Sequence, residues 1–108
     1  EIITKYEDLA ALNVNLGNVD TCTRLNAGTG VDTDTLDNWA DAATKTLSVL
    51  VSATGVATFL IDGVAPTTNT NTLTFLTGEV LIPFMAFTKA ATNTDTPPNL
   101  VSFFAGHQ

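Results

Sequence analysis

The sequence predicts an all-β domain, an antiparallel two-layer β-sandwich of the jelly-roll type. Hydrophobic residues make up 44% of the 108 positions, enough for a core, while charged residues make up only 14%. Threonine supplies much of the polar surface, and its branched Cβ suits the exposed face of a strand. Short stretches with a period of two are separated by turn residues about every ten positions, which is typical of sandwiches. The length predicts one domain over residues 1–108.

The first third of the chain contains one ambiguous segment and one predicted hairpin. Residues 2–12 fit a short helix, because Ile3, Tyr6 and Ala10 fall roughly on one helical face. Residues 12–17 then alternate between apolar and polar, and Gly17-Asn18 predicts a hairpin turn into a strand over 19–25. A turn is expected at 27–30. Residues 31–43 are polar and rich in aspartate, so we predict mostly loop there.

The middle of the chain gives the clearest alternation. Strands are predicted over 45–53 and 56–61, joined by a turn at Thr54-Gly55. Asp62-Gly63 is a turn dipeptide, because both residue types tolerate a positive φ. A further strand is predicted over 72–77, where Leu73 and Phe75 alternate with threonines, and Gly78 ends it.

The last third is more apolar. Residues 79–87 are apolar on both faces, which predicts a strand covered on both sides by a second sheet, a neighbouring chain or a loop. Pro83 lacks an N–H and predicts an edge position or a bulge. Residues 92–99 are expected to form a loop and 100–104 the last of about seven or eight strands. The phenylalanines are expected mostly in the core, and eight predicted core residues are Leu47, Val49, Val51, Phe59, Ile61, Phe75, Ile82 and Phe84.

Charge and cysteine content argue against several classes of function. The net charge is −7, and the four cationic residues are spread along the chain, so we expect no nucleic-acid surface. No apolar run approaches the ~18 residues of a membrane span. Cys22 is the only cysteine, which leaves no intrachain disulfide and predicts a small buried thiol. Because the chain opens at Glu1 rather than methionine, we expect residues upstream of it.

Catalytic signatures are missing from the sequence. His107 is the only histidine and lies one residue from the end, a poor place for a positioned base. No nucleophile elbow, zinc-protease, P-loop or dinucleotide motif occurs. Glutamates are few and form no pattern that would place two carboxylates across a cleft. We therefore predict that the chain is not an enzyme and uses no cofactor.

Two weaker patterns concern ligands and interfaces. Asp32, Asp34 and Asp37 could bind calcium, although an EF-hand loop would need Gly and Glu where Asp37 and Ala43 stand. A solvated acidic loop is the favoured interpretation, with a β-sandwich calcium site as the alternative. Trp39 either stacks on a sugar, anchors an interface or plugs one end of the sandwich. With Trp39, we take Pro83 and Met85 as candidate interface or ligand contacts.

Residues 39–82 resemble a pattern found in structural proteins of tailed bacteriophages. The shared segments, in order, are Trp39-Ala40-Asp41, residues 46–55, residues 56–67 and residues 78–84, and residues 8–17 resemble the family's upstream strand. The resemblance implies a concanavalin A-like jelly roll, the fold of laminin-G modules and lectins, here without its N-terminal strands. These strands would lie upstream or come from another chain.

The same resemblance implies a function on the virion surface. It implies a capsid decoration, a head fibre or a tail-fibre module, whose partners are copies of itself and other virion proteins. The apolar segment 79–87 and the threonine-rich faces would supply contact surface. The alternative is a lectin-like carbohydrate-binding module for host recognition, because jelly rolls host many lectins and a fold does not imply a function.

Overall fold

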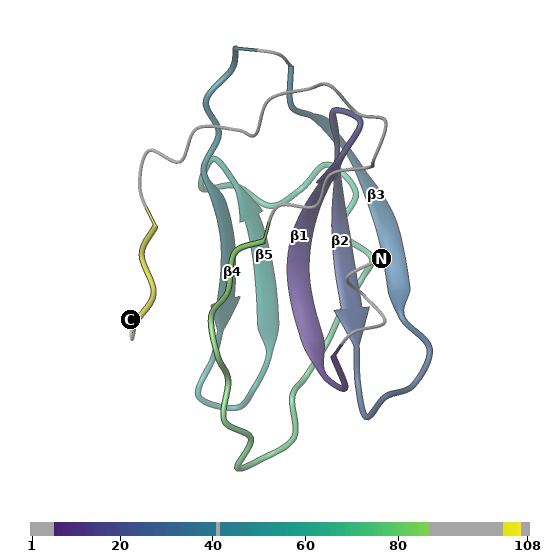
Figure 1. Ribbon diagram of the computed structural model, residues 1–108, viewed down its shortest axis with the longest axis vertical. Coiled ribbons are helices and arrows are strands. Elements are labelled where there is room, and N and C mark those ends of the chain that lie inside the picture. The colour runs from purple at the N-terminus through teal and green to yellow at the C-terminus, as the bar shows by residue number, and fades with distance from the viewer. Residues whose placement is uncertain (1–5, 41, 87–102, 107–108) are drawn as a thin grey trace.

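The chain forms two antiparallel β-sheets (Figure 1). The computed structural model describes residues 6–40, 42–86 and 103–106. One sheet has the order β1-β2-β3, and the other pairs β4 with β5. The strands are β1 (Leu9–Asn15), β2 (Asn18–Arg24), β3 (Val31–Asn38), β4 (Leu47–Val51) and β5 (Ala57–Ile61). The described residues contain no helix, hence none that could cross a membrane. The prediction of an all-β, antiparallel chain is confirmed.

The first hairpin begins earlier than its sequence pattern indicates. β1 starts at Leu9, so the prediction of a short helix over residues 2–12 is wrong from Leu9 onward. Residues 1–5 lie outside the described part. The turn between β1 and β2 is Leu16-Gly17, one residue before the predicted Gly17-Asn18. Both turn residues have positive φ, 51° and 84°, as a type I′ turn requires. Leu16 tolerates this position with its side chain 96% exposed.

β3 occupies most of the segment that we predicted as loop. Thr35 is buried and pairs with the inner face of β2, while Asp32 and Asp34 lie on the opposite face. The register shifts near the end of the strand, where Leu36 has a positive φ of 63°. The prediction was wrong because the inward residue is a threonine, and a pattern based on apolar side chains does not detect it.

The second sheet follows its predicted turns closely. β4 and β5 pair from Leu47↔Ile61 to Val51↔Ala57. Gly55 and Gly63 have φ values of 86° and 81°, which confirms both as turn residues. Residues 73–75 run along the other side of β5, where the N–H of Ala57 donates to the carbonyl of Leu73 at 2.9 Å. Only a single bridge, Val56↔Thr74, forms there, so the predicted strand over 72–77 is reduced to a short extended segment.

The core overlaps only in part with the predicted one. Phe59, Ile61 and Phe75 are buried as expected, with Phe59 only 1% exposed, and Leu47 is half-buried. Val49 and Val51 are 37% and 38% exposed, which corrects their assignment to the core. Both lie on β4, which pairs only with β5 among the strands that the structure describes. A strand at the edge of a sheet has no neighbour to cover its outer flank.

The apolar segment after Gly78 is exposed, against the prediction of a strand covered on both faces. Residues 79–86 form no strand, and Ile82 and Phe84, two predicted core residues, are exposed. Phe84 stacks on Tyr6, with ring centroids 5.3 Å apart. Pro83 carries no N–H for a ladder, and no described strand pairs with this segment. We call its most exposed side chains the apolar strip: Val80, Leu81, Ile82 and Met85.

The end of the chain departs from the sequence prediction in the same way. Phe103 and Phe104 are exposed and lie outside any strand, although residues 100–104 were predicted as one. The expectation that most phenylalanines are core residues therefore fails for Phe84, Phe103 and Phe104. The predicted loop over 92–99 and residues 100–102 lie outside the described part. Five strands are described in place of the seven or eight expected.

A buried polar cluster joins the first sheet to the loop after β5. Asn71 is buried, and its amide donates to the carbonyls of Thr21, at 2.9 Å, and Val31, at 3.2 Å. Its Oδ1 accepts a hydrogen bond from the hydroxyl of Thr23 at 2.6 Å. Nearby, Thr35 donates to the carbonyl of Val19. Threonine and asparagine thus share the inner face of this sheet with apolar residues such as Val19, and hydrogen bonds offset the burial of the polar groups.

Candidate functional site

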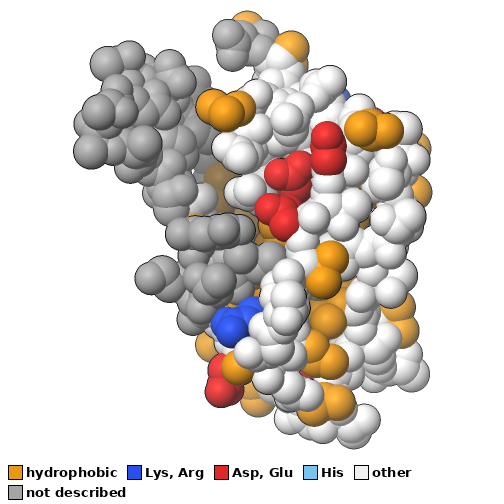
Figure 2. Space-filling model, turned by 90° about the vertical axis from the view of Figure 1, so that its right-hand side faces the viewer, with side chains coloured by type: hydrophobic (Ala, Val, Ile, Leu, Met, Phe, Trp, Pro, Cys, Tyr) orange, Lys and Arg blue, Asp and Glu red, His pale blue; other side chains and the backbone are white. Residues whose placement is uncertain are grey.

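Three aspartates gather on the outer face of the first sheet. Asp20 lies directly across from Asp34, and Cys22 lies across from Asp32. Side chains two residues apart on a strand point to the same face, so all four share it. Figure 2, which views the molecule from the β3 side, shows a group of acidic side chains there. Burial raises the pKa of Asp20 above its ordinary value, and the charges of Asp32 and Asp34 raise it further.

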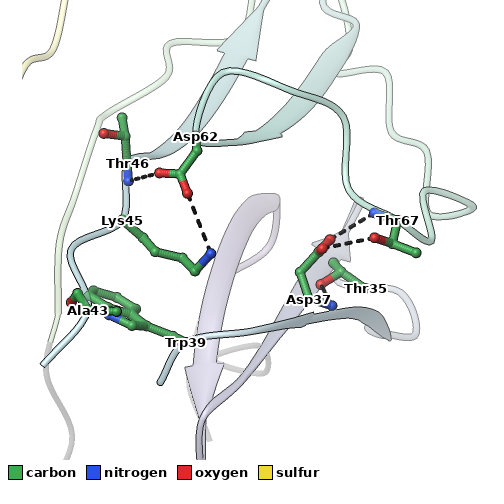
Figure 3. A network of polar contacts seen from close by, with 8 residues as sticks. All are labelled: Thr35, Asp37, Trp39, Ala43, Lys45, Thr46, Asp62 and Thr67. Carbon is green, nitrogen blue, oxygen red and sulfur yellow. Dashed lines mark hydrogen bonds and ion pairs between the residues drawn. The ribbon is translucent and has the colours of Figure 1, made fainter. Parts of the chain in front are cut away.

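Asp37 lies apart from this group, and its carboxylate binds another segment of the chain. Its carboxylate accepts hydrogen bonds from the backbone N–H of Thr67 at 2.8 Å and from the Thr67 hydroxyl at 2.9 Å (Figure 3). These two bonds, the backbone one first, lower the pKa of Asp37. The carboxylate therefore fastens the loop after β5 to the end of β3.

The structure keeps Asp37 apart from the other two candidate calcium ligands, Asp32 and Asp34. Asp32 accepts a hydrogen bond from the Cys22 thiol at 3.1 Å, and Asp34 accepts one from the N–H of Leu36 at 2.8 Å. The irregular backbone at Leu36 separates Asp37 from both. Among the described residues, no group of three or more histidine, cysteine, aspartate or glutamate side chains could hold a metal ion. Cys22 is buried, as the sequence predicts.

Trp39 ties the end of β3 to two neighbouring turns. Its backbone N–H donates to the carbonyl of Gly17 at 2.7 Å, and its indole N–H donates to the carbonyl of Ala43 at 2.8 Å (Figure 3). The side chain is half-buried. Its one polar atom is thus used within the chain, and the exposed part of the ring offers apolar surface only.

Asp62 fastens the start of β4 to the end of β5. It accepts hydrogen bonds from the backbone N–H of Thr46 at 2.8 Å and from the Lys45 ammonium at 3.4 Å (Figure 3). The bond from Thr46 is the main cause of a lowered pKa at Asp62, and Lys45 adds to it. The Lys45–Asp62 ion pair is exposed, so we assign it a small contribution to stability.

Sequence reasoning missed the residues that hold the loop after β5 in place. Thr67 and Asn71 belong to a run of threonines and asparagines over 67–72 whose local pattern does not distinguish one residue from the next. What singles them out is contact with Asp37 and with β2, residues that are far away in the sequence. No local signal could have found them.

Several apolar side chains in the described part are strongly exposed. Val80 and Ile82 of the apolar strip are 89% and 80% exposed, and both Pro83 and Met85, candidate contacts from the sequence, are exposed there. A second feature is a groove of about 280 Å³ between β4 and Phe103 and Phe104, with a mixed polar and apolar lining. These surfaces suit contact with other protein better than bond-making chemistry. Comparison of the chain with protein-family models, with curated proteins and with solved structures found no match.

Proposed function

We propose that this chain is a non-enzymatic structural module of a tailed-phage particle, placed on its surface as a capsid decoration, head fibre or tail-fibre part. It works by packing against copies of itself and other virion proteins. The observation that carries the proposal is the apolar strip, in which Val80 and Ile82 are 89% and 80% exposed. Water contact with apolar side chains is unfavourable by about 25 cal/mol per Å², so a partner surface would stabilise this segment.

The phage setting is supported by the sequence resemblance over residues 39–82. In this proposal the two sheets are parts of a concanavalin A-like jelly roll, a two-layer sandwich whose remaining strands come from upstream residues or a neighbouring subunit. The exposure of two valines on β4 fits that view. Val49 and Val51 of β4 are more than a third exposed, and further strands would cover them.

Asp37 and Asp62 support a structural role for their carboxylates. The carboxylates of Asp37 and Asp62 accept hydrogen bonds from backbone N–H groups of neighbouring segments. Their lowered pKa values mean that they stay charged at neutral pH, as a turn-fastening group should. A general acid or base would need a pKa moved the other way, toward the working pH.

A lectin function has less support from the contacts. The indole N–H of Trp39 is used by Ala43, so this side chain could recognise a sugar only by stacking. The aromatic ring of Tyr6 stacks on Phe84. A glycan array with the wild-type chain and a Trp39→Ala variant separates the two functions. We expect no sugar-dependent signal from either protein.

The direct experiment is to purify particles from an infected culture that expresses the chain and to label them with an antibody raised against it. We expect the chain in many copies on the outer surface. Particles that lack it, while the cell lysate contains it, would contradict the proposal.

The apolar strip is tested in the same system with a Val80→Thr/Ile82→Thr double variant. We expect the amount of the chain on particles to fall by about tenfold, which corresponds to about 1.4 kcal/mol of contact energy. Val64→Thr is the matched control, because Val64 is also exposed but lies outside the strip. Equal incorporation of the double variant and the control would show that the strip is not the contact surface.

A further inference from the structure

Among the described strands, none pairs with the edge of β4 that points away from β5. The N–H of Asp62 donates to the carbonyl of Thr46, and the N–H of Ser52 donates to that of Val56. In this register the even-numbered residues of β4 bond to β5, so the N–H and C=O groups of the odd-numbered residues point away from it. Within the described part of the chain, no backbone hydrogen bond reaches these outward groups of Leu47, Val49 and Val51.

The groove of about 280 Å³ runs along this edge. Five consecutive residues of the chain, 46–50, line one side, and Phe103 and Phe104 line the other. A groove on one face of a strand would be lined by alternate residues, so consecutive residues place it along the edge. In Figure 1 residues 103–106 lie on the side of β4 away from β5.

The β4 edge also lacks the charges, prolines and bulges that keep sheet edges apart. Natural edge strands carry charges, prolines or bulges that block pairing with another chain. β3, an outer strand of the first sheet, has Asp32, Asp34 and an irregular backbone at Leu36. In contrast, no charged residue and no proline lies between Lys45 and Asp62.

We propose that this edge pairs with the β4 edge of a second copy of the chain, antiparallel and about a two-fold axis at Val49. In that register Val49 lies opposite Val49 of the copy, and Leu47 lies opposite Val51. The outward N–H groups of all three residues then meet outward carbonyls, because each is in the hydrogen-bonding position. The two second sheets join into one continuous sheet.

Side chains and charge favour a copy as the occupant. The pairing places Leu47, Val49 and Val51 beside the same three residues of the copy, on the face that Phe59 and Ile61 share. β-Branched pairs across strands stabilise a sheet. Lys45 falls opposite Ala53 of the copy, so no like charges meet, and the acidic face carrying Asp20, Asp32 and Asp34 belongs to the other sheet. Two chains of net charge −7 therefore associate through an uncharged strand.

This inference rests on the proposed function, since it names one self-contact of a module that works by packing, but it concerns a different surface from the apolar strip. The first test is amide hydrogen exchange measured by NMR on the 108-residue chain at two concentrations. We expect the amide hydrogens of Leu47, Val49 and Val51 to exchange rapidly in dilute solution. At the concentration where the chain is dimeric, their exchange should be slower by at least about tenfold. Ser48 and Leu50 are internal controls, because their amides already bond to β5 in each copy.

Two variants test the geometry. Val49→Pro removes an outward N–H and leaves the β4–β5 bonds in place, so we expect the dimer dissociation constant measured by sedimentation to rise at least about tenfold. Val49→Cys should oxidise to a covalent dimer, since paired strands bring these Cα atoms within disulfide range. Thr58→Cys, an exposed position on β5, should not cross-link.

The outcomes separate the two proposals. In one outcome, the chain coats particles while its odd-numbered β4 amides exchange rapidly even in the dimer. That result overturns the β4 contact and leaves the proposed function standing. Slow exchange of these amides in the monomer also overturns it, because the edge would then be covered within one chain. A β4-linked dimer that is absent from particles overturns the proposed function alone.

Discussion

Replacing Asn71 with alanine should be among the more destabilising single changes in the chain, although its sequence surroundings give no hint of this. Asn71 is buried, and its side chain makes three hydrogen bonds, to the Thr21 carbonyl, the Val31 carbonyl and the Thr23 hydroxyl. A protein hydrogen bond contributes about 0.5–1.5 kcal/mol net, and a buried group left without a partner costs about 1–3 kcal/mol.

The three bonds do not count equally. Thr21 is fully buried, so its carbonyl would lose one donor, the Asn71 amide, without gaining water. Val31 is exposed, and its carbonyl can be hydrated when the amide is gone. The Thr23 hydroxyl can rotate toward another acceptor. We therefore expect Asn71→Ala to lower the free energy of unfolding by about 2–3 kcal/mol, a large share of a small domain's stability.

Urea unfolding followed by the fluorescence of Trp39, the only tryptophan, measures the change. Asn69→Ala in the same loop is the control, because Asn69 is exposed, and it should shift the free energy by less than about 0.5 kcal/mol. Combining Asn71→Ala with Thr23→Val tests the pair directly. We expect the double variant to lose less than the sum of the single variants. A near-neutral Asn71→Ala, or strict additivity, would refute this account of the buried cluster.

Further predictions concern the second sheet and the turns. Phe59→Ala should lower the free energy of unfolding by about 3–5 kcal/mol, because Phe59 is 1% exposed; a loss below about 1.5 kcal/mol would contradict its place in the core. Gly55→Ala should be more destabilising than Gly78→Ala in thermal unfolding. Both glycines have a φ of 86°, but only at Gly55 would the added Cβ meet another atom, the carbonyl oxygen of Phe75 at 2.5 Å. Equal melting temperatures of the two variants would count against the structure. Asp37 has a pKa below its ordinary 3.8, so its contribution to stability is present above that pH and is lost as the pH falls through the lowered value. Asp37→Asn should therefore reduce the difference in urea midpoint between pH 7 and pH 3, and an unchanged difference would exclude that role.

The sequence predicts the second sheet better than the first. β4 and β5 have apolar residues at alternate positions and a glycine turn between them, so local patterns identify both strands. In β3 the buried residue is Thr35, held by a hydrogen bond to β2, and the neighbouring aspartates suggested a loop. Hydrophobic periodicity could not find this strand, because hydrogen bonding rather than apolar burial fixes its inner face.

The candidate site shows the same division. The acidic composition of residues 32–37 can be read from the sequence, but the separation of Asp37 from Asp32 and Asp34 depends on the backbone at Leu36. Trp39 was a candidate for a sugar or an interface, and its contacts with Gly17 and Ala43 depend on how two turns meet. The side chains were therefore predictable as residue types, while their partners were not.

The sequence by itself determined that this chain is built from antiparallel strands, that glycines at 55 and 63 turn it, and that Phe59 and Phe75 are buried. These features follow from side-chain periodicity and from backbone angles that glycine adopts without strain, both local properties. Only the tertiary structure decided that Asn71 fastens a loop to the first sheet and that residues 80–85 lie exposed. It also decided that, among the described strands, β4 pairs with β5 alone. Each of these depends on which distant segment lies beside which, because burial and hydrogen-bond pairing are properties of neighbours in space.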